Sequence, residues 1–568
     1  MSHLPGRATA GLPATARRLA AAALPALLAL PLLAGAAGPG GLPAAARPGP
    51  AEAATAAHLA RSARPAPGSP APVIDWALSG QASASTSGPG TPAASAIDGN
   101  AGSDWCPSEW TGTLTVDLGQ ARSVSDLGIT LDSASPSAQA TIQVTTRAGD
   151  WQAVPAARNV ALDPGSPVYL PLPRGSQVRY AQLTVNSGTG APVCVGEFRM
   201  FGSDPAAAGM ALGADLSFTP QELAAGATFT YHGRAQSPVT IMRENGANYV
   251  RLRLWVNPPP GYNDLASDLA LARQVRAAGM RLLLDIQYSD FWADPTKQPV
   301  PAAWQGQDLA QLRTTVRSYT RQVIAAFAGQ GTPVDMVAIG NEIRNGMLWP
   351  AGEVDWTANT GWDNLAALLK AGIAGARAGN PPGHPLAIML HFDQGGDNQQ
   401  SQEFFQNLVA RGVPFDVIGL SYYPFFHGPI SAMRQNVDAL ATQFGKPVII
   451  AETQYPWTLA NGDSLGNFLW QGSQLSPGYP ASPGGQLSFV SDELSILAQV
   501  PGGLGAGLFY WAPEWIPGVG WEPGAGTPND NLTLFNFQGT ALPSAGIFRN
   551  PAAVCASYDP YDVPCTLR

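Results

Sequence analysis

The stretch VDMVAIGNEIRNG, residues 334–346, places an apolar run directly before a glycine, an amide and a carboxylate. The stretch PVIIAETQYPW, residues 447–457, ends a second apolar run on Glu452. A carboxylate at the end of a buried strand is costly, because an unpaired charge loses its hydration or raises its pKa until it is neutral. The two stretches therefore indicate that Glu342 and Glu452 serve one site built from strand ends.

Eight short apolar runs, including these two, recur between residues 213 and 513. They are GADLSF (213–218), YVRLRLWV (249–256), RLLLDIQY (281–288), DMVAIGNE (335–342), LAIMLHF (386–392), FDVIGLSYYP (415–424), PVIIAETQYP (447–456) and GAGLFYWAP (505–513). Most are separated by amphipathic segments, such as 268–279 and 312–329. This alternation predicts an α/β fold, a (β/α)₈ TIM barrel. A doubly wound open sheet is the alternative, but no glycine-rich phosphate loop follows the first run.

The composition bounds the size of the fold and the kind of partner. A chain of 568 residues is too long for one ordinary core, so two or more domains are expected. The net charge of −9 argues against nucleic acid or an anionic membrane as the main partner. The 15 Trp and 14 Tyr offer faces for stacking on sugar rings, although core packing accounts for most of them.

The N-terminal segment has the order of a secretory signal, with an arginine pair before an apolar stretch that ends in small residues. We expect residues 1–36 to be removed on export, which leaves a secreted protein without a membrane contact. A membrane anchor is the alternative, but Pro25 and Pro31 interrupt the run. Residues 37–73 are rich in Ala, Pro and Gly and are expected to form a solvated linker.

The next segment, residues 74–203, has the pattern of an all-β sandwich. Short alternating runs at 113–119, 140–147 and 179–186 are separated by Gly, Pro, Ser and Asp. The four cysteines fit an oxidising compartment and none has zinc-site spacing. Their natural pairing joins Cys106 to Cys194 and Cys555 to Cys565.

Polar and aromatic residues gather at the ends of the expected barrel strands, where active sites of this fold lie. They are Arg251, Arg253, Trp255, Tyr288, Ser289, Asp290, Trp292, Asp294, Asn341, Glu342, His391, Asp393, Tyr422, Tyr423, Glu452, Trp511, Glu514 and Trp515. Two carboxyl groups at one mouth are what glycoside hydrolysis requires, one to protonate the leaving oxygen and one to attack the anomeric carbon. The alternative is that each Glu makes a structural ion pair with a barrel Arg.

The motifs GADLS, VRLRLWVNP, YSDFWADPTKQPVPAAW, IGNEI followed by GMLWP, GLSYYPFFHG, AETQYPWT and NLTLFNFQG run in this order over about residues 209–548. Together they resemble glycoside hydrolase family 53, the arabinogalactan endo-β-1,4-galactanases, within the 4/7 superfamily of retaining barrels. The resemblance implies an endo-acting enzyme that cleaves β-1,4-galactosidic linkages in galactan or arabinogalactan by double displacement. It implies acid/base catalysis by Glu342, nucleophilic attack by Glu452 and no cofactor for the chemistry.

The same resemblance implies roles for further residues. Asn341 would bond the sugar 2-hydroxyl, and Arg251 or Arg253 would hold the nucleophile ionised. Expected sugar platforms are Trp292, Trp349, Trp511 and Trp515, and expected orienting groups are Tyr422, Tyr423, His391 and Asp290, with core packing as the alternative for each. The two glutamates should lie about 5–5.5 Å apart, as in retaining enzymes.

Structural calcium is possible at two places. Some bacterial relatives bind it in the loop that here reads NGDSLGN, where Asn461, Asp463 and Asn467 could supply ligands, although Leu465 stands where another is wanted and an ordinary polar turn is the alternative. The sandwich resembles the discoidin, or factor V/VIII type C, domains, which overlap with family 32 carbohydrate-binding modules. The matching runs are SAIDGNAGSDWCP, LTVDLG and VGEFRMFG. That resemblance implies a calcium site at Asp98, Asn100, Ser103 and Glu197, and a carbohydrate ligand.

Residues 549–568 remain as a C-terminal extension, and a monomer is expected. Two other functions stay open. One is a related β-glycanase acting on mannan or glucan, since the superfamily shares the two glutamates. The other is a non-catalytic carbohydrate-binding protein, which the presence of both Glu342 and Glu452 disfavours.

Overall fold

The computed structural model describes residues 73–203, 209–258, 261–520, 526–549, 551, 554 and 565–566. The expected signal segment lies outside the described residues, as does the expected linker except Val73. Cys555, one partner of the predicted disulfide with Cys565, also lies outside them, so this disulfide stays a prediction. Within the described part of the chain, no helix has the length and apolar character that a bilayer crossing needs.

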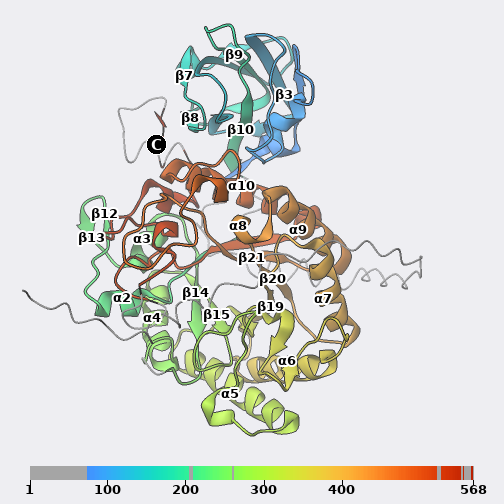
Figure 1. Cartoon of the computed structure of the whole chain (residues 1–568), viewed down its shortest axis with the longest axis vertical. Helices are drawn as coiled ribbons and strands as arrows, with labels where there is room; N and C mark the ends of the chain where they lie inside the picture. Colours follow the sequence, from blue (N-terminus) through green and yellow to red (C-terminus); the bar gives the residue numbers. More distant parts are fainter. Residues whose placement is uncertain are drawn as a thin grey trace, which may run out of the picture. The chain divides into compact units, whose positions relative to one another are not determined.

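Eight parallel strands close into a barrel, which confirms the predicted fold (Figure 1). In order around the barrel they are β11 (Ala211–Asp215), β14 (Tyr249–Leu254), β15 (Arg281–Ile286), β16 (Met336–Ile339), β19 (Ala387–Phe392), β20 (Val417–Ser421), β21 (Val448–Thr453) and β22 (Gly505–Tyr510). Each strand pairs with the next in parallel, and β22 pairs back to β11. Each overlaps one of the eight apolar runs.

Helices follow the strands and cover the outside of the barrel (Figure 1). They are α2 (Thr219–Ala224), α3 (Pro238–Glu244), α4 (Leu265–Ala277), α5 (Leu309–Gly329), α6 (Trp362–Gly379), α7 (Asn398–Ala410), α8 (Pro424–His427), α9 (Ile430–Phe444) and α10 (Pro483–Ala498). Asp264 and Asp308 start α4 and α5, because each accepts a hydrogen bond from the third backbone N–H of its helix. Two short hairpins, β12 (Thr230–Tyr231) with β13 (Arg234–Ala235) and β17 (Gly346–Met347) with β18 (Gly352–Glu353), lie in the loops.

The barrel interior is apolar along most of the strands and polar at their C-terminal ends. The buried apolar cluster comprises Ala211, Tyr249, Leu283, Met336, Ala338, Met389, Val417, Ile449, Ala451 and Phe509. Because side chains alternate along a strand, Tyr249 is followed on the same face of β14 by Arg251 and then Arg253. Both arginines are buried. The inward face of β14 therefore changes along the strand, from an apolar side chain in the packed interior to two charged side chains at the mouth.

Two irregularities in strand pairing help to build that mouth. The register of β20 against β21 shifts between Leu420 and Ser421, and the register of β21 against β22 shifts between Ile450 and Thr453. Such shifts re-aim side chains at the rims of barrels. Glu452 lies within the second shift and pairs with Ser421 across the first.

The N-terminal part is a sandwich of two antiparallel sheets, as predicted. One sheet has the order β1 (Val73–Asp75), β10 (Val195–Ser203), β4 (Asp126–Leu131), β8 (Val168–Pro171) and β23 (Cys565–Thr566). The other has the order β2 (Gln81–Ala84), β3 (Thr111–Ser123), β9 (Gln177–Asn186), β5 (Ala138–Thr145) and β6 (Gln152–Ala153), with β7 (Val160–Leu162) on β5. The predicted disulfide between Cys106 and Cys194 is present.

Helix α10 contacts the sandwich through buried polar groups. Arg199 donates to both carboxylate oxygens of Asp492 at 2.8 and 2.6 Å, and both side chains are at most 1% exposed. The hydroxyls of Tyr169 and Ser488 are 2.7 Å apart. Residues 484–497 of α10 are all buried, so this helix is covered on every side.

Candidate active site

Glu342 and Glu452 both stand at the C-terminal ends of barrel strands. Glu342 follows β16 and adopts a left-handed backbone conformation with φ 46°, which is rare for a residue with a side chain and recurs at functional sites. Glu452 lies in β21 and is 6% exposed. The two carboxyl groups influence one another electrostatically, and both act on the hydroxyl of Tyr423. Their predicted separation of about 5–5.5 Å stays a prediction.

Arg251 is the cation at the centre of this mouth. Its guanidinium lies 2.6 Å from Glu452 Oε1, 2.5 Å from Asp215 Oδ2 and 2.9 Å from Asp285 Oδ2. It also donates to Asn341 Oδ1 at 3.0 Å. The open choice between the two strand arginines is therefore resolved in favour of Arg251.

Glu452 has two donors, and this separates it from Glu342. Arg251 pairs with one carboxylate oxygen, and the Tyr423 hydroxyl donates to the other at 2.9 Å. Burial raises the pKa of Glu452 to about 7, and Arg251 opposes this rise. The cation therefore favours the ionised form of Glu452.

Glu342 has the opposite surroundings. Although its side chain keeps some solvent contact, desolvation raises its pKa well above the usual range, and the charges of Glu452 and Asp393 raise it further. Ser421 Oγ lies 2.6 Å from its Oε1 and is its one hydrogen-bond partner among the described residues. Glu342 therefore holds its proton to a higher pH than Glu452 does.

Asn341 and His391 connect these groups behind the mouth. His391 Nδ1 lies 3.0 Å from Asn341 Oδ1, and His391 Nε2 lies 2.9 Å from Ser421 Oγ. His391 is fully buried, and burial together with the Arg251 charge keeps its pKa well below the usual range. A neutral, fully buried His391 orients neighbouring side chains and does not face the open mouth.

Arg253 belongs to an aromatic cluster and makes no ion pair within the described residues. Its guanidinium carbon lies 4.0 Å from the ring centre of Trp292, 4.7 Å from Phe218 and 4.9 Å from Trp255. Trp511 and Trp515 pack against the same Phe218. Of the expected platforms in this cluster, Trp292 is partly exposed, whereas Trp511 and Trp515 are buried.

Three expected binding residues make hydrogen bonds within the protein, and their contacts to substrate stay predictions. Tyr422 is fully buried and donates to the Gly428 carbonyl at 2.8 Å. The carboxylate of Asp290 accepts the backbone N–H groups of residues 257 and 302. Trp349 donates from Nε1 to the Asn345 carbonyl and stays partly exposed. The structure thus brings Tyr423, and not Tyr422, to the glutamates.

Three site residues were not singled out from the sequence. Asp215 and Asp285 flank Arg251, and Ser421 contacts Glu342. Each lies at or near the end of an apolar run, so a charged or hydroxyl residue within such a run is the signal that could have found it. Ser421 was overlooked because the two tyrosines that directly follow it were taken as the site residues of this strand end.

The expected calcium ligands of the sandwich come together. Asp98 accepts from the hydroxyl of Ser103 at 2.7 Å and from the backbone of Asn100 at 2.9 Å, and Glu197 Oε1 accepts from the N–H groups of Gly99 and Asn100 at 2.8 Å each. Glu197 Oε2 is buried without a hydrogen-bond partner among the described residues. An orphaned carboxylate oxygen of this kind fits a bound cation.

The residues expected to form the barrel calcium site make hydrogen bonds that hold their own loop together. Asp463 accepts the backbone N–H groups of Leu465 and Thr527, each at 2.7 Å. Asn467 donates from Nδ2 to Asp530 at 2.8 Å, and Asn461 accepts from the backbone of Asp463. These bonds account for an ordered polar turn, and calcium binding here stays a prediction.

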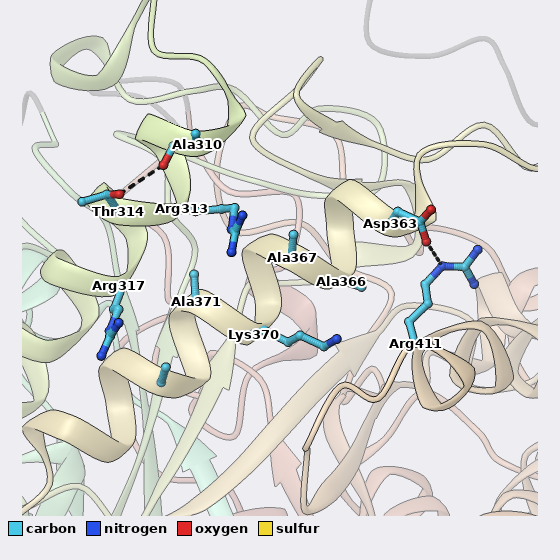
Figure 2. Close-up of a pocket in the computed structure, with 11 residues that line it drawn as sticks. Ala310, Arg313, Thr314, Arg317, Asp363, Ala366, Ala367, Lys370, Ala371 and Arg411 are labelled. Carbon is cyan, nitrogen blue, oxygen red and sulfur yellow. Dashed lines mark hydrogen bonds and ion pairs between the residues drawn. The ribbon is translucent and has the colours of Figure 1, made fainter.

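A large surface pocket lies away from the glutamates. It has a volume of about 740 Å³ and is formed by α5, α6 and Arg411 (Figure 2). Arg313, Arg317 and Lys370 line it over a floor of alanines, and Asp363 is paired with Arg411 at 2.7 Å. It contains none of the expected site residues, and the single carboxylate in its lining is already paired, so we place the chemistry at the barrel mouth.

A parallel (β/α)₈ barrel with two glutamates at the ends of its fourth and seventh strands defines a barrel-type glycoside hydrolase as a class. The family model of glycosyl hydrolase family 53 matches residues 211–548, more than half of the chain, and the chain belongs to this family. The F5/8 type C domain model matches residues 81–197. Both findings confirm the resemblances drawn from the motifs.

The chain is similar to individual proteins and to a solved structure. A Niallia circulans protein named "Uncharacterized protein in bgaB 5'region" is 42% identical over 339 residues, which are 59% of this chain and 92% of that protein. The endo-beta-1,4-galactanase of Bacillus subtilis (strain 168) is 32% identical over 377 residues, with 59% and 85% covered. The solved Ignisphaera aggregans GH53 catalytic domain is 36% identical, with 60% of this chain and 95% of that one covered and a TM-score of 0.56.

Proposed function

We propose that this enzyme cleaves β-1,4-galactosidic linkages inside galactan or arabinogalactan chains, with retention of anomeric configuration. The observation that carries the proposal is the unequal environment of the two glutamates. Arg251 and Tyr423 donate to Glu452, whereas Glu342 faces carboxylates and one hydroxyl. Membership of a family that includes proteins named endo-β-1,4-galactanase supports the choice of galactan.

The two environments suit the two roles of a retaining glycosidase. In the first step, Glu452 attacks the anomeric carbon while Glu342 gives its proton to the leaving oxygen, so the glycosidic bond breaks and a glycosyl ester forms. In the second step, water attacks the anomeric carbon, Glu342 takes a proton from the water, and the bond from that carbon to Glu452 breaks, which releases the sugar and the Glu452 carboxylate. The two carboxyl groups supply both steps, so no cofactor is proposed for the chemistry.

The substrate is tested by product analysis on purified β-1,4-galactan beside β-mannan and β-glucan, with Glu452→Gln as the inactive control. We expect short oligosaccharides from galactan alone. Cleavage of mannan or β-glucan in place of galactan would assign another glycanase of the superfamily. A folded protein that binds but cleaves none of the three would be a carbohydrate-binding protein.

For the sandwich, we propose a carbohydrate-binding role on a secreted enzyme, supported by the F5/8 type C match and the disulfide. Insoluble galactan gives the test. If the sandwich binds carbohydrate, removing it weakens retention on the insoluble polymer more than it slows cleavage of soluble galactan. Equal losses would point to a structural role.

We also propose that Asp98, Asn100, Ser103 and Glu197 hold calcium, because Glu197 presents a buried oxygen without a partner. A ligand bound only by the folded state stabilises it by mass action. Calcium added back after chelation should therefore raise the melting temperature, and the rise should vanish in Glu197→Gln. An unchanged melting temperature in the wild type would contradict the site.

A further inference from the structure

A continuous chain of hydrogen bonds and one ion pair joins the two glutamates behind the barrel mouth. Its members, in order, are Glu342, Ser421, His391, Asn341, Arg251 and Glu452. The four inner side chains are buried. Because each contact needs one hydrogen and each group carries a known number of them, the direction of every bond can be worked out.

The amide of Asn341 fixes one end of the chain. Its Nδ2 donates to the Ala293 carbonyl at 2.8 Å, and its Oδ1 accepts from Arg251 at 3.0 Å. The Ala293 carbonyl can only accept a hydrogen bond, and the Arg251 guanidinium can only donate one. The amide nitrogen of Asn341 must therefore face the carbonyl, and its oxygen must face the guanidinium. Oδ1 therefore acts as an acceptor toward every neighbour.

This acceptor decides the tautomer of His391. Nδ1 lies 3.0 Å from Asn341 Oδ1, so Nδ1 must carry a hydrogen for the contact to be a hydrogen bond. The ring is neutral, since burial and the nearby Arg251 disfavour a second proton. Nε2 is then bare and must accept the hydrogen of Ser421, whose Oγ lies 2.9 Å away.

Ser421 has a single hydrogen and two neighbours that can accept it. While that hydrogen points to His391, the 2.6 Å contact with Glu342 Oε1 must be made by a hydrogen on the carboxyl group. When Glu342 is ionised, the same contact would join lone pairs unless the hydroxyl turns toward it. A serine hydroxyl can turn in this way because only one single bond rotates.

We propose that Ser421 is a positioning residue whose hydroxyl hydrogen points to His391 when the Glu342 proton lies on Oε1 and turns to Glu342 when that proton leaves. This proposal rests on the acid/base role proposed above for Glu342. No proton is gained or lost over the full reaction cycle. The Glu342 proton goes to the leaving oxygen and is regained from the attacking water, while the Ser421 hydrogen stays on its own oxygen. The acid/base group thus keeps a hydrogen-bond partner in both of its protonation states.

The tautomer of His391 can be measured in the wild-type protein, with one variant needed only to assign its signal. The chain has six histidines, so ¹⁵N-histidine labelling of the full protein gives few ring signals, and His391→Leu identifies the one of interest. We expect a neutral ring with its hydrogen on Nδ1 over the pH range of activity. A hydrogen on Nε2, or an imidazolium, would overturn the proposal even if galactan proved not to be the substrate.

The coupling through Ser421 is tested by the alkaline limb of kcat/KM against pH, which reports the proton of Glu342 in the free enzyme. Groups that face Glu342 from other elements are Glu452, Asp393, Asp294 and Tyr423, and these stay in place. His391→Leu removes the second acceptor, so Ser421 donates to Glu342 at all times. We expect the limb to move to lower pH by about one unit, the usual effect of one hydrogen bond to a carboxylate.

The same substitution in a Ser421→Ala background should leave the alkaline limb where it is, because the connecting hydroxyl is gone. In Ser421→Thr, which keeps the hydroxyl, the shift of about one pH unit should return. His384→Leu, a histidine replacement remote from the chain of hydrogen bonds, should move nothing. An equal shift with and without the Ser421 hydroxyl, or no shift in any background, would overturn the proposal.

Discussion

Arg251 and Arg253 stand two residues apart on β14 and share its inner face, yet their surroundings differ. Arg251 contacts three carboxylates, whereas Arg253 lies among three aromatic rings. Burial lowers the pKa of Arg253 to about 10, because its acidic neighbours compensate only part of the lost hydration. The first arginine therefore pairs with Glu452, the proposed nucleophile, and the second holds the aromatic side of the mouth in place.

We predict different kinetic effects when each arginine is replaced by lysine. Arg251→Lys keeps one charge but loses the planar fork that reaches Glu452, Asp215 and Asp285 together, and kcat should fall by about 100-fold or more. Arg253→Lys should change KM more than kcat, because it disturbs the ring of Trp292. Steady-state kinetics on soluble galactan decides this, and equal losses of kcat would contradict the division of roles.

For single residues of the site, the sequence supports some assignments better than others. Glu342, Asn341 and Glu452 could be predicted because a polar residue that ends a long apolar run has few other reasons to be there. The choice between Tyr422 and Tyr423 could not, because successive side chains point to opposite faces and the register shift beside Ser421 decides which one faces inward.

Among the elements, helix α2 and the segment after β22 bring a second pair of acids together, Glu222 and Glu514. Glu222 is buried and has an oxygen without a hydrogen-bond partner in the described part of the chain. It lies near the Glu514 carboxylate, which accepts from Thr219. Burial and this neighbour raise the pKa of Glu222 to about 9. A carboxyl group with a raised pKa binds its proton more tightly in the folded state than in the unfolded chain, so folding loses stability as the pH rises.

The predicted effect is on the pH dependence of stability. Between the unfolded pKa of 4.5 and about 9, Glu222 lowers the free energy of unfolding by about 1.4 kcal/mol for each pH unit. Glu222→Gln cannot ionise, so its free energy of unfolding should fall less steeply between pH 5 and pH 8. Denaturant unfolding at several pH values measures this, with the exposed Glu353→Gln as control. Parallel curves for Glu222→Gln and the wild type would show that Glu222 is ionised in the fold.

The barrel elements could be predicted because their strands are nearly continuous apolar runs and their helices begin at capping residues such as Asp264 and Asp308. The breaks in register within β20 and β21 could not be predicted. They are set by the neighbouring strands, which a single run of sequence does not contain.

In the whole molecule, the sandwich and the barrel share buried surface. Arg199 of β10 and Asp492 of α10 form a bidentate pair without solvent contact, and Tyr169 and Phe201 belong to the same apolar cluster as the barrel helices. Breaking a buried pair on one side leaves an uncompensated charge, which costs more than the pair contributes. The sequence predicted both domains but not this contact, because its two partners lie far apart in the chain.

We predict that Arg199→Ala destabilises the protein by about 3–5 kcal/mol, because Asp492 is left buried without its partner. The double variant Arg199→Met with Asp492→Leu should recover most of that loss. Arg179→Ala, which breaks a solvent-exposed pair with Asp117, should cost far less, because water screens that pair. Calorimetry of the full chain gives the comparison, and similar small losses for both single variants would show that the sandwich does not rely on α10.

The central claim, that Glu452 attacks and Glu342 transfers protons, is tested most directly by azide rescue on an activated aryl β-galactoside long enough to fill the site. Glu342→Ala should still form the glycosyl ester, so azide should yield the β-glycosyl azide. Glu452→Ala has no nucleophile, so azide should attack directly and yield the α-glycosyl azide. NMR of the two azides reads the result. The opposite anomers would reverse the two roles, and loss of less than about 100-fold in galactan cleavage for both variants would place the site elsewhere.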